Sequence, residues 1–118
     1  MSEGAPSPAE VVQRQLDAYN SRDLDAFLAT FHDEAKVFGL GAETPSFAGK
    51  AAIAQRYQEL FDRSPDLHSV VVNRTAFGRA VIDLERITGR NGSPEPLDLL
   101  AIYEVLHGLI VRVHFVWP

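Results

Sequence analysis

The chain has 118 residues, a formal net charge of −5, no cysteine, and hydrophobic residues at 46% of its positions. This length suffices for one domain with a single hydrophobic core. The lack of cysteine excludes disulfides, thiolate nucleophiles and cysteine-bound zinc, and the acidic balance without a Lys/Arg run argues against a nucleic-acid partner. With no signal peptide and no apolar stretch of roughly 20 residues, the sequence predicts a soluble, cytoplasmic protein without a membrane partner.

The beginning of the chain predicts a mobile N-terminus over residues 1–6, followed by a single domain over residues 7–118. Residues 1–6 are small and polar and include Gly and Pro. The segment SPAE at 7–10 has the pattern of a capping box with proline at the first helical position. We therefore expect a helix that begins at Pro8 and ends near Asn20.

Two more helices are predicted from the spacing of apolar residues. One spans Leu24–Phe31 after a cap at Asp23, and the other spans Lys50–Asp62 and ends before the Ser-Pro pair at 64–65. A short strand is expected between them, at Lys36–Leu40.

The rest of the chain changes to extended, β-branched-rich segments separated by turn residues. In the last of them, Val111, Val113, Phe115 and Trp117 alternate with Arg112, His114 and Val116, which predicts one buried face. Helices followed by antiparallel strands are typical of the α+β class. The expected strands are Leu67–Phe77, Arg79–Arg90, Pro96–His107 and Leu109–Trp117.

This order of elements, with five short segments, resembles the ketosteroid isomerase and SnoaL-like group of the nuclear-transport-factor-2-like (cystatin-like) superfamily. The segments are VVQR at 11–14, YNSRDLDAF at 19–27, FHDEAKV at 31–37, GKAAI at 49–53 and the hairpin around Gly108. The resemblance implies three N-terminal helices packed on a strongly curved antiparallel sheet, a cone-shaped α+β barrel with an apolar pocket, and commonly a homodimer. It implies no single activity, because the superfamily holds isomerases, cyclases, hydrolases, dehydratases and non-catalytic binders.

The resemblance also implies where the chemistry of a ketosteroid isomerase would lie. The oxyanion tyrosine falls at Gln15, the carboxylate base at Gly39 and the second oxyanion acid at about Ile102, whereas the supporting tyrosine is retained as Tyr57. Because glycine cannot accept a proton and isoleucine cannot donate one, we expect no appreciable isomerase activity of the usual kind. The acid–base aspartate of SnoaL-like cyclases likewise has no counterpart in the final segment, HFVWP.

Carboxylates on the strands are the remaining candidates for acid–base chemistry. If Asp83, Glu85 and Glu104 point into the cone, an apolar pocket would raise their pKa and let them act near neutral pH. The opposite strand parity would bury Ile82 and Leu84 and leave the acids in water, and the pattern alone leaves both parities open. Asp83 and Glu104 are the preferred catalytic candidates, for proton-transfer or lyase-type chemistry.

The predicted pocket wall consists mainly of aromatic residues on expected inward faces, with Gln15, Tyr19 and Tyr57 as polar handles. Each aromatic residue taken singly is more simply a core residue. The predicted ligand-binding residues are Gln15, Tyr19, Phe27, Phe31, Phe38, Phe47, Tyr57, Ile102, Phe115 and Trp117.

No metal site and no cofactor are predicted. The residues His32-Asp33-Glu34, expected at the end of the second helix, would not converge on one ion and match no zinc motif. The glycines around Leu40 lack the spacing of a phosphate-binding loop.

Two functions are therefore predicted as alternatives. In the first, the protein binds a small, mostly apolar molecule in a cone-shaped pocket, with or without proton-transfer chemistry. In the second, it is a non-catalytic dimerisation or protein-interaction module whose vestigial pocket is filled by Phe27, Phe31, Phe61 and Trp117.

Overall fold

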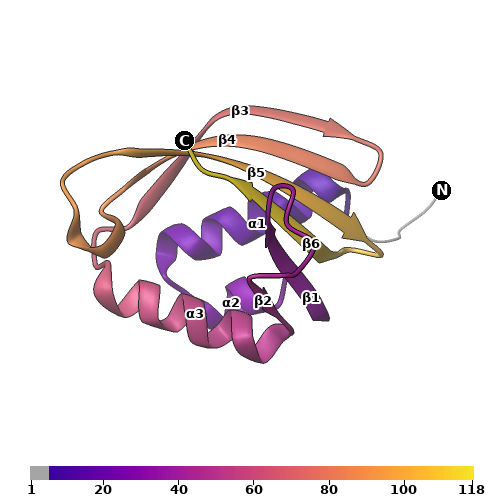
Figure 1. Ribbon diagram of the computed structural model, residues 1–118, viewed down its shortest axis with the longest axis horizontal. Coiled ribbons are helices and arrows are strands. Elements are labelled where there is room, and N and C mark those ends of the chain that lie inside the picture. The colour runs from indigo at the N-terminus through magenta and orange to yellow at the C-terminus, as the bar shows by residue number, and fades with distance from the viewer. Residues whose placement is uncertain (1–5) are drawn as a thin grey trace.

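Three helices lie on one face of a curved six-stranded sheet in the computed structural model, which describes residues 6–118 (Figure 1). Of the N-terminal segment expected to be mobile, all but Pro6 therefore lies outside the described residues. The helices are α1 (Pro8–Ser21), α2 (Leu24–Leu28), α3 (Lys50–Arg63) and a short 3-10 helix, η1 (Arg90–Gly92). The strands are β1 (Phe31–Gly39), β2 (Phe47–Ala48), β3 (His68–Phe77), β4 (Ala80–Thr88), β5 (Leu97–Leu106) and β6 (Leu109–Val116).

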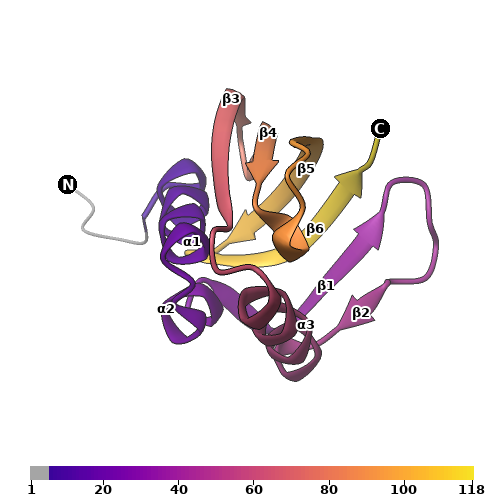
Figure 2. The same cartoon turned by 90° about the vertical axis from the view of Figure 1, so that its left-hand side faces the viewer.

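The strand order in the sheet is β2-β1-β6-β5-β4-β3. Strands β3 to β6 form an antiparallel meander, whereas β1 pairs with β6 in parallel, so the sheet is mixed and not purely antiparallel as predicted. Figure 2 shows the sheet curving around α1 and α3. The predicted α+β class, with three helices on a curved sheet, is confirmed.

Helix α1 begins where the sequence predicts it. The Ser7 hydroxyl accepts a hydrogen bond from the Glu10 N–H at 3.2 Å, and the Ser7 N–H donates to the Glu10 carboxylate at 2.8 Å. At its other end, the Asn20 amide bonds to both the N–H and the carbonyl of Ser69, at 2.8 and 3.0 Å. These contacts attach α1 to β3 and lay its apolar face across the sheet.

The second helix is shorter than predicted, and β1 is longer. Helix α2 ends at Leu28, and the Thr30 hydroxyl donates to the Phe27 carbonyl at 2.7 Å. The Thr30 carbonyl then accepts the Ile110 N–H at 2.8 Å, which starts the pairing of β1 with β6. Strand pairing thus overrides the helical spacing that had placed Phe31 in the helix.

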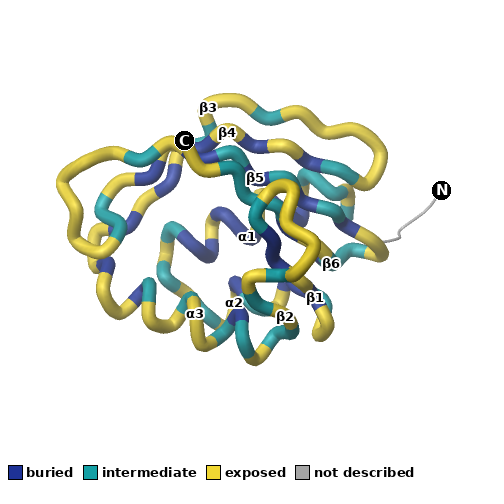
Figure 3. Tube along the Cα trace, in the orientation of Figure 1, coloured by how far each residue is buried: buried dark blue, intermediate teal, exposed yellow. Residues whose placement is uncertain are grey.

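The inner face of β4 carries every second side chain, beginning with Val81, whereas Ile82 and Leu84 point outward and are each 37% exposed. Figure 3 shows this alternation of buried and exposed positions along the strands. On β6 a bulge interrupts the alternation, because Arg112 pairs with Glu104 while Ile110 pairs with the next residue of β5. Ile110 therefore takes the buried position that the sequence pattern had given to Val111.

Aromatic rings fill the interior around α2. The Phe27 ring, fully buried, lies 4.5 Å from the Tyr57 ring, 5.1 Å from Phe31 and 5.9 Å from Phe61, measured between ring centroids. These offset contacts stabilise the junction of α2, α3 and β1. None of the helices in the described part of the chain is long and apolar enough to span a membrane.

The backbone of Gly89 is the tightest point next to η1, and it generates a first prediction. Gly89 and Gly92 both have a φ of +73°. A Cβ on Gly89 would overlap the backbone of Asp66, whereas a Cβ on Gly92 would have no other heavy atom within 4 Å. We expect Gly92→Ala to lower the free energy of unfolding by about 1 kcal/mol and Gly89→Ala by about 3 kcal/mol or more, because the backbone must also move. Urea unfolding of both variants measures this, and equal losses would contradict the account.

Candidate functional site

A cavity of about 250 Å³ lies between α1, α3 and the inner face of the sheet. Its lining includes residues of α3, of the segment around η1 and of the end of β6. Seven of the residues predicted to bind a ligand line it: Gln15, Tyr19, Phe38, Phe47, Tyr57, Phe115 and Trp117.

The other predicted ligand-binding residues lie elsewhere. Phe27 and Phe31 are part of the packed core beneath the cavity. Ile102 pairs with Ile82 and His114 on the outer face of the sheet, because the residues of β5 that point inward are its odd-numbered ones. The placement of Ile102 in the pocket is therefore wrong.

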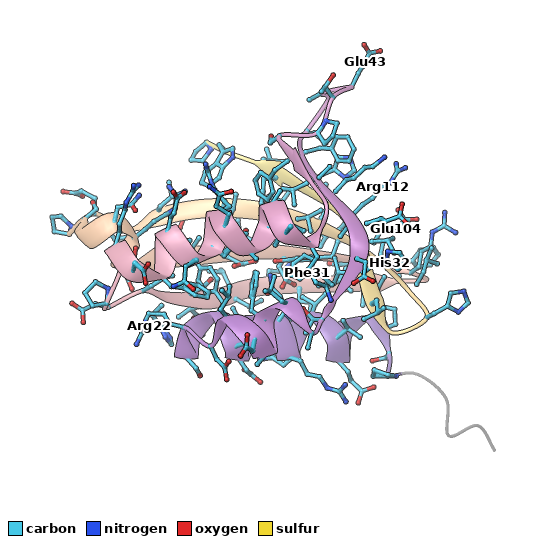
Figure 4. All side chains as sticks on the ribbon, turned by 90° about the horizontal axis from the view of Figure 1, so that it is seen from below. Arg22, Phe31, His32, Glu43, Glu104 and Arg112 are labelled. Atoms are coloured by element: carbon cyan, nitrogen blue, oxygen red, sulfur yellow. The ribbon has the colours of Figure 1, made fainter. Side chains whose placement is uncertain are left out.

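Neither preferred catalytic carboxylate reaches the cavity. Glu104 shares the outer face with Ile102 and forms an ion pair with Arg79 at 2.7 Å. In Figure 4, Glu104 lies beside Arg112 on one side of β1, and Phe31 lies on the helix side. The expectation that Glu104 points into the cone is corrected by the register of β5 and β6.

Asp83 points inward, which is one of the two parities that the sequence left open, but it is held in an ion pair. Its two carboxylate oxygens accept from Arg74 at 2.7 and 2.9 Å, and Arg74 also donates to the Gln13 side chain at 2.9 Å. Asp83 is 1% exposed and does not line the cavity. A buried bidentate pair of this kind fixes the packing of α1 on β3 and β4, so Asp83 has a structural role.

Glu85 is the carboxylate that does line the cavity. It is 7% exposed, and its oxygens accept from the Ser69 hydroxyl at 2.8 Å and from the Tyr103 hydroxyl at 3.2 Å. Burial raises the pKa of Glu85 above its usual 4.5, and the nearby Asp83 charge raises it further, while the two hydroxyl donors oppose the shift. A carboxyl group with a raised pKa in a cavity wall is suited to accept and return a proton.

Three tyrosines border the cavity beside Glu85, namely Tyr19, Tyr57 and Tyr103. Burial raises the pKa of all three phenols, to about 12 for Tyr57, so they remain hydrogen-bond donors at neutral pH. Tyr103 is committed to Glu85. Within residues 6–118, the hydroxyls of Tyr19 and Tyr57 have no protein partner, and no fully buried side-chain polar atom lacks one, so both hydroxyls face the open cavity.

Three arginines at the mouth of the cavity, Arg56, Arg63 and Arg90, are functional candidates that the sequence analysis missed. The guanidinium of Arg56 lies over the Phe47 ring, 5.8 Å from its centroid, and that of Arg90 lies over Trp117 at 5.2 Å. The signal was weak, because exposed arginines on a helix usually belong to a solvated face. The only usable hint was that Arg56 and Arg63 lie seven residues apart on the same side of α3 as Tyr57 and Leu60.

The residues His32-Asp33-Glu34, predicted at the end of the second helix, lie on strand β1 instead. His32 is the second residue of β1, and its Nδ1 accepts from the Glu34 N–H at 3.0 Å, so the imidazole is engaged locally. Across residues 6–118, no group of three or more His, Asp or Glu side chains converges in a way that could hold a metal ion.

Comparison with known proteins places the chain in a family. The sequence profile of the SnoaL-like domain matches residues 12–113. The chain belongs to the SnoaL-like domain family. No curated protein matches this chain.

Solved structures with the same fold cover almost the whole SnoaL-like chain. An uncharacterised cystatin-fold protein from Novosphingobium aromaticivorans is 26% identical, with a TM-score of 0.84, and the alignment covers 94% of this chain and 98% of the other. A protein from Kribbella flavida, provisionally described as a ketosteroid isomerase, is 22% identical, with a TM-score of 0.80 and coverage of 94% and 77%. A protein from Jannaschia sp. CCS1, provisionally described as a SnoaL-like polyketide cyclase, is 19% identical, with a TM-score of 0.78 and coverage of 98% and 88%.

The raised pKa of Glu85 generates a second prediction. The unfolded chain ionises this group near pH 4.5, whereas the folded chain keeps the proton to higher pH, so the folded state binds more protons in that window. Stability that this group contributes at low pH is therefore lost as the pH rises through the folded pKa. We expect Glu85→Gln to remove this fall in the free energy of unfolding, measured by urea titration at a series of pH values from 4.5 upward.

Asp83→Asn is the matched control, because it changes a carboxylate two residues away on the same face. It should lower the free energy of unfolding at neutral pH by about 2 to 3 kcal/mol, since Arg74 loses its partner but keeps a fifth of its side chain in water. Most of the pH dependence should remain in this variant. The assignment to Glu85 fails if Glu85→Gln has the same pH profile as the unchanged protein.

Proposed function

We propose that the SnoaL-like cavity binds a compact, mostly apolar small molecule, and that Glu85 transfers a proton to and from it. The observation that carries this proposal is the position of Glu85: a buried carboxylate in the cavity wall, oriented by Ser69 and Tyr103 and close to two tyrosine hydroxyls that face the cavity. The descriptions of the relatives from Kribbella flavida and Jannaschia as an isomerase and a cyclase agree with a site for small-molecule chemistry.

The size and lining of the cavity support a compact ligand. Its volume of about 250 Å³ lies just below the range of about 300–1,000 Å³ that is usual for ligand pockets. Its apolar wall comes from Leu16, Val37, Leu60, Ile87, Leu99 and the rings of Phe47, Phe115 and Trp117. A flat ring system of two or three rings matches such a wall, because aromatic side chains favour stacked and edge contacts.

The proposed chemistry uses only groups of this chain. Each Glu85 oxygen accepts one hydroxyl hydrogen bond and keeps a second lone pair, with which the ionised carboxylate can remove a proton adjacent to a carbonyl. The Tyr19 and Tyr57 hydroxyls, held protonated by their raised pKa, can donate to the oxyanion that forms on the substrate. Glu85 then returns the proton to another carbon, completing an isomerisation, or to a leaving hydroxyl, completing the loss of water.

The second candidate, an interaction module with a filled cone, requires aromatic side chains to occupy the cavity. Phe27, Phe31 and Phe61 are indeed packed in the core, but Trp117 is 46% exposed at the mouth. The space between Tyr19, Tyr57 and Leu99 remains open. This observation favours the binding function.

Binding is tested by titrating Trp117 fluorescence with neutral compounds of two classes, steroids and polyketide-like aromatics. We expect saturable quenching by at least one class, because Trp117 lines the mouth of the cavity. Leu99→Phe should weaken that binding about tenfold or more by filling the cavity, whereas Leu100→Phe, one residue along on the outer face, should not. A flat response from the unchanged protein to both classes would favour the interaction module.

We also propose that the protein forms a homodimer through the outer face of the sheet. Ile82, Leu84, Leu100, Ile102 and Val116 form an apolar surface there, and the ion pairs Arg79–Glu104 and Arg86–Asp98 flank it. An apolar surface with a polar margin is typical of a buried interface.

Light scattering during gel filtration tests the dimer. We expect twice the 13.0 kDa of one chain for the unchanged protein and a single chain for Leu84→Lys, because a buried lysine would lack a partner. Leu40→Lys, at an exposed leucine in the loop after β1, is the control and should remain dimeric. A single-chain mass for the unchanged protein would exclude the dimer.

A further inference from the structure

The mouth of the cavity has the opposite charge to the rest of the molecule. The chain carries a formal net charge of −5, yet Arg56, Arg63 and Arg90 line the mouth together with one exposed carboxylate, Glu59. Arg56 and Arg63 lie two turns apart on α3, about 10 Å along its axis. The local excess of positive charge points to a negatively charged group on the ligand.

In the described part of the chain, none of these three arginines forms an ion pair. Within residues 6–118, the arginines that form ion pairs are Arg74, Arg79 and Arg86, all on or next to the strands of the meander. The side chains of Arg56, Arg63 and Arg90 have no hydrogen-bonded partner among those residues either. Their N–H groups are therefore available to a ligand.

The two guanidinium groups that stack on aromatic rings are also held in place. The Arg56 Cζ lies 5.8 Å from the Phe47 ring centroid and the Arg90 Cζ lies 5.2 Å from that of Trp117, both within the range of a cation–π contact. The N–H groups of such a guanidinium can still donate to the two oxygens of a carboxylate. Less side-chain freedom is then lost when an anion binds.

The backbone fixes the two sides of the mouth relative to each other. The Asn91 N–H, next to Arg90, donates to the Ser64 hydroxyl at 2.7 Å, so η1 is attached to the end of α3 directly after Arg63. The mouth arginines thus border one opening rather than separate surfaces. The positive charges of Arg56 and Arg90 also act inside the cavity, because they lower the pKa of Tyr57 while burial raises it.

We propose that the ligand of this cavity is an anion, an aromatic or alicyclic carboxylate whose apolar body lies among the cavity rings and whose carboxylate lies at the mouth beside Arg56 and Arg90. This inference rests on the proposed binding function and assigns it a substrate class. The carboxylate orients the molecule, because it places the opposite, neutral end of the ring system toward Glu85 and the tyrosine hydroxyls. Arg63 strengthens the local positive field.

The test compares two probes of the same shape, 2-naphthoate and its neutral amide, 2-naphthamide, by isothermal titration calorimetry at low salt. We expect the unchanged protein to bind 2-naphthoate about tenfold or more tightly than 2-naphthamide, which corresponds to one charge-assisted contact of about 1.4 kcal/mol. The preference should shrink as salt is added, because the mouth is open to solvent.

Variants assign the preference to the mouth. Arg56→Gln/Arg90→Gln should lose the preference for 2-naphthoate over 2-naphthamide, while Arg56→Lys/Arg90→Lys should keep part of it. Arg79→Gln, which removes an arginine from the outer face, is the control and should keep all of it.

The outcomes separate the two proposals. Equal affinities of the unchanged protein for the two probes, or an unchanged preference in Arg56→Gln/Arg90→Gln, would overturn the anionic substrate class and leave the binding function in place. If neither probe binds, and the steroids and neutral aromatics also fail to bind, both proposals are overturned.

Discussion

The register of β4 decides what faces the helices, and most of the structure depends on it. Its pairing with β3 and β5 directs Val81, Asp83, Glu85 and Ile87 inward. A slip of one residue would put Ile82 and Leu84 there and move both carboxylates into water. The inner face therefore carries two acids, which the fold must accommodate: Asp83 by a bidentate arginine and Glu85 by two hydroxyl groups.

The ion pair of Asp83 and the hydroxyl hydrogen bonds of Glu85 divide the interior into a structural part and a functional part. The Arg74 pair neutralises Asp83 where α1 packs on the sheet, and neither residue lines the cavity. Among residues 6–118, the groups that bond to the Glu85 carboxylate are two neutral hydroxyls and no cation. Burial of this carboxyl group therefore raises its pKa, whereas Asp83 is compensated by an ion pair. The cavity opens at that second place. Positive charge is instead concentrated at its mouth, on α3 and η1, where water still reaches the guanidinium groups.

Much of the fold could be predicted from the sequence, because its signals are local. The capping box at Ser7, the turn glycines and the period-2 strands lie within a few residues of what they determine. The parity of β4 was undecidable, since apolar residues occupy both of its faces. The bulge at Val111 and the strand start at Phe31 depend on pairing with distant strands, which no local pattern encodes. The sequence analysis preferred Glu104 to Glu85 and omitted the mouth arginines for the same reason. The role of each side chain depends on neighbours that are distant in the sequence.

The most direct test of this account is the pH titration of the Glu85 carboxyl carbon by ¹³C NMR, with the resonance assigned by its loss in Glu85→Gln. The account predicts a midpoint clearly above 4.5 that moves further when a neutral ligand fills the cavity and removes water from the carboxylate. A midpoint at or below 4.5, unaffected by ligand, would show that Glu85 is a solvated or fully compensated carboxylate and would contradict its proposed role in proton transfer.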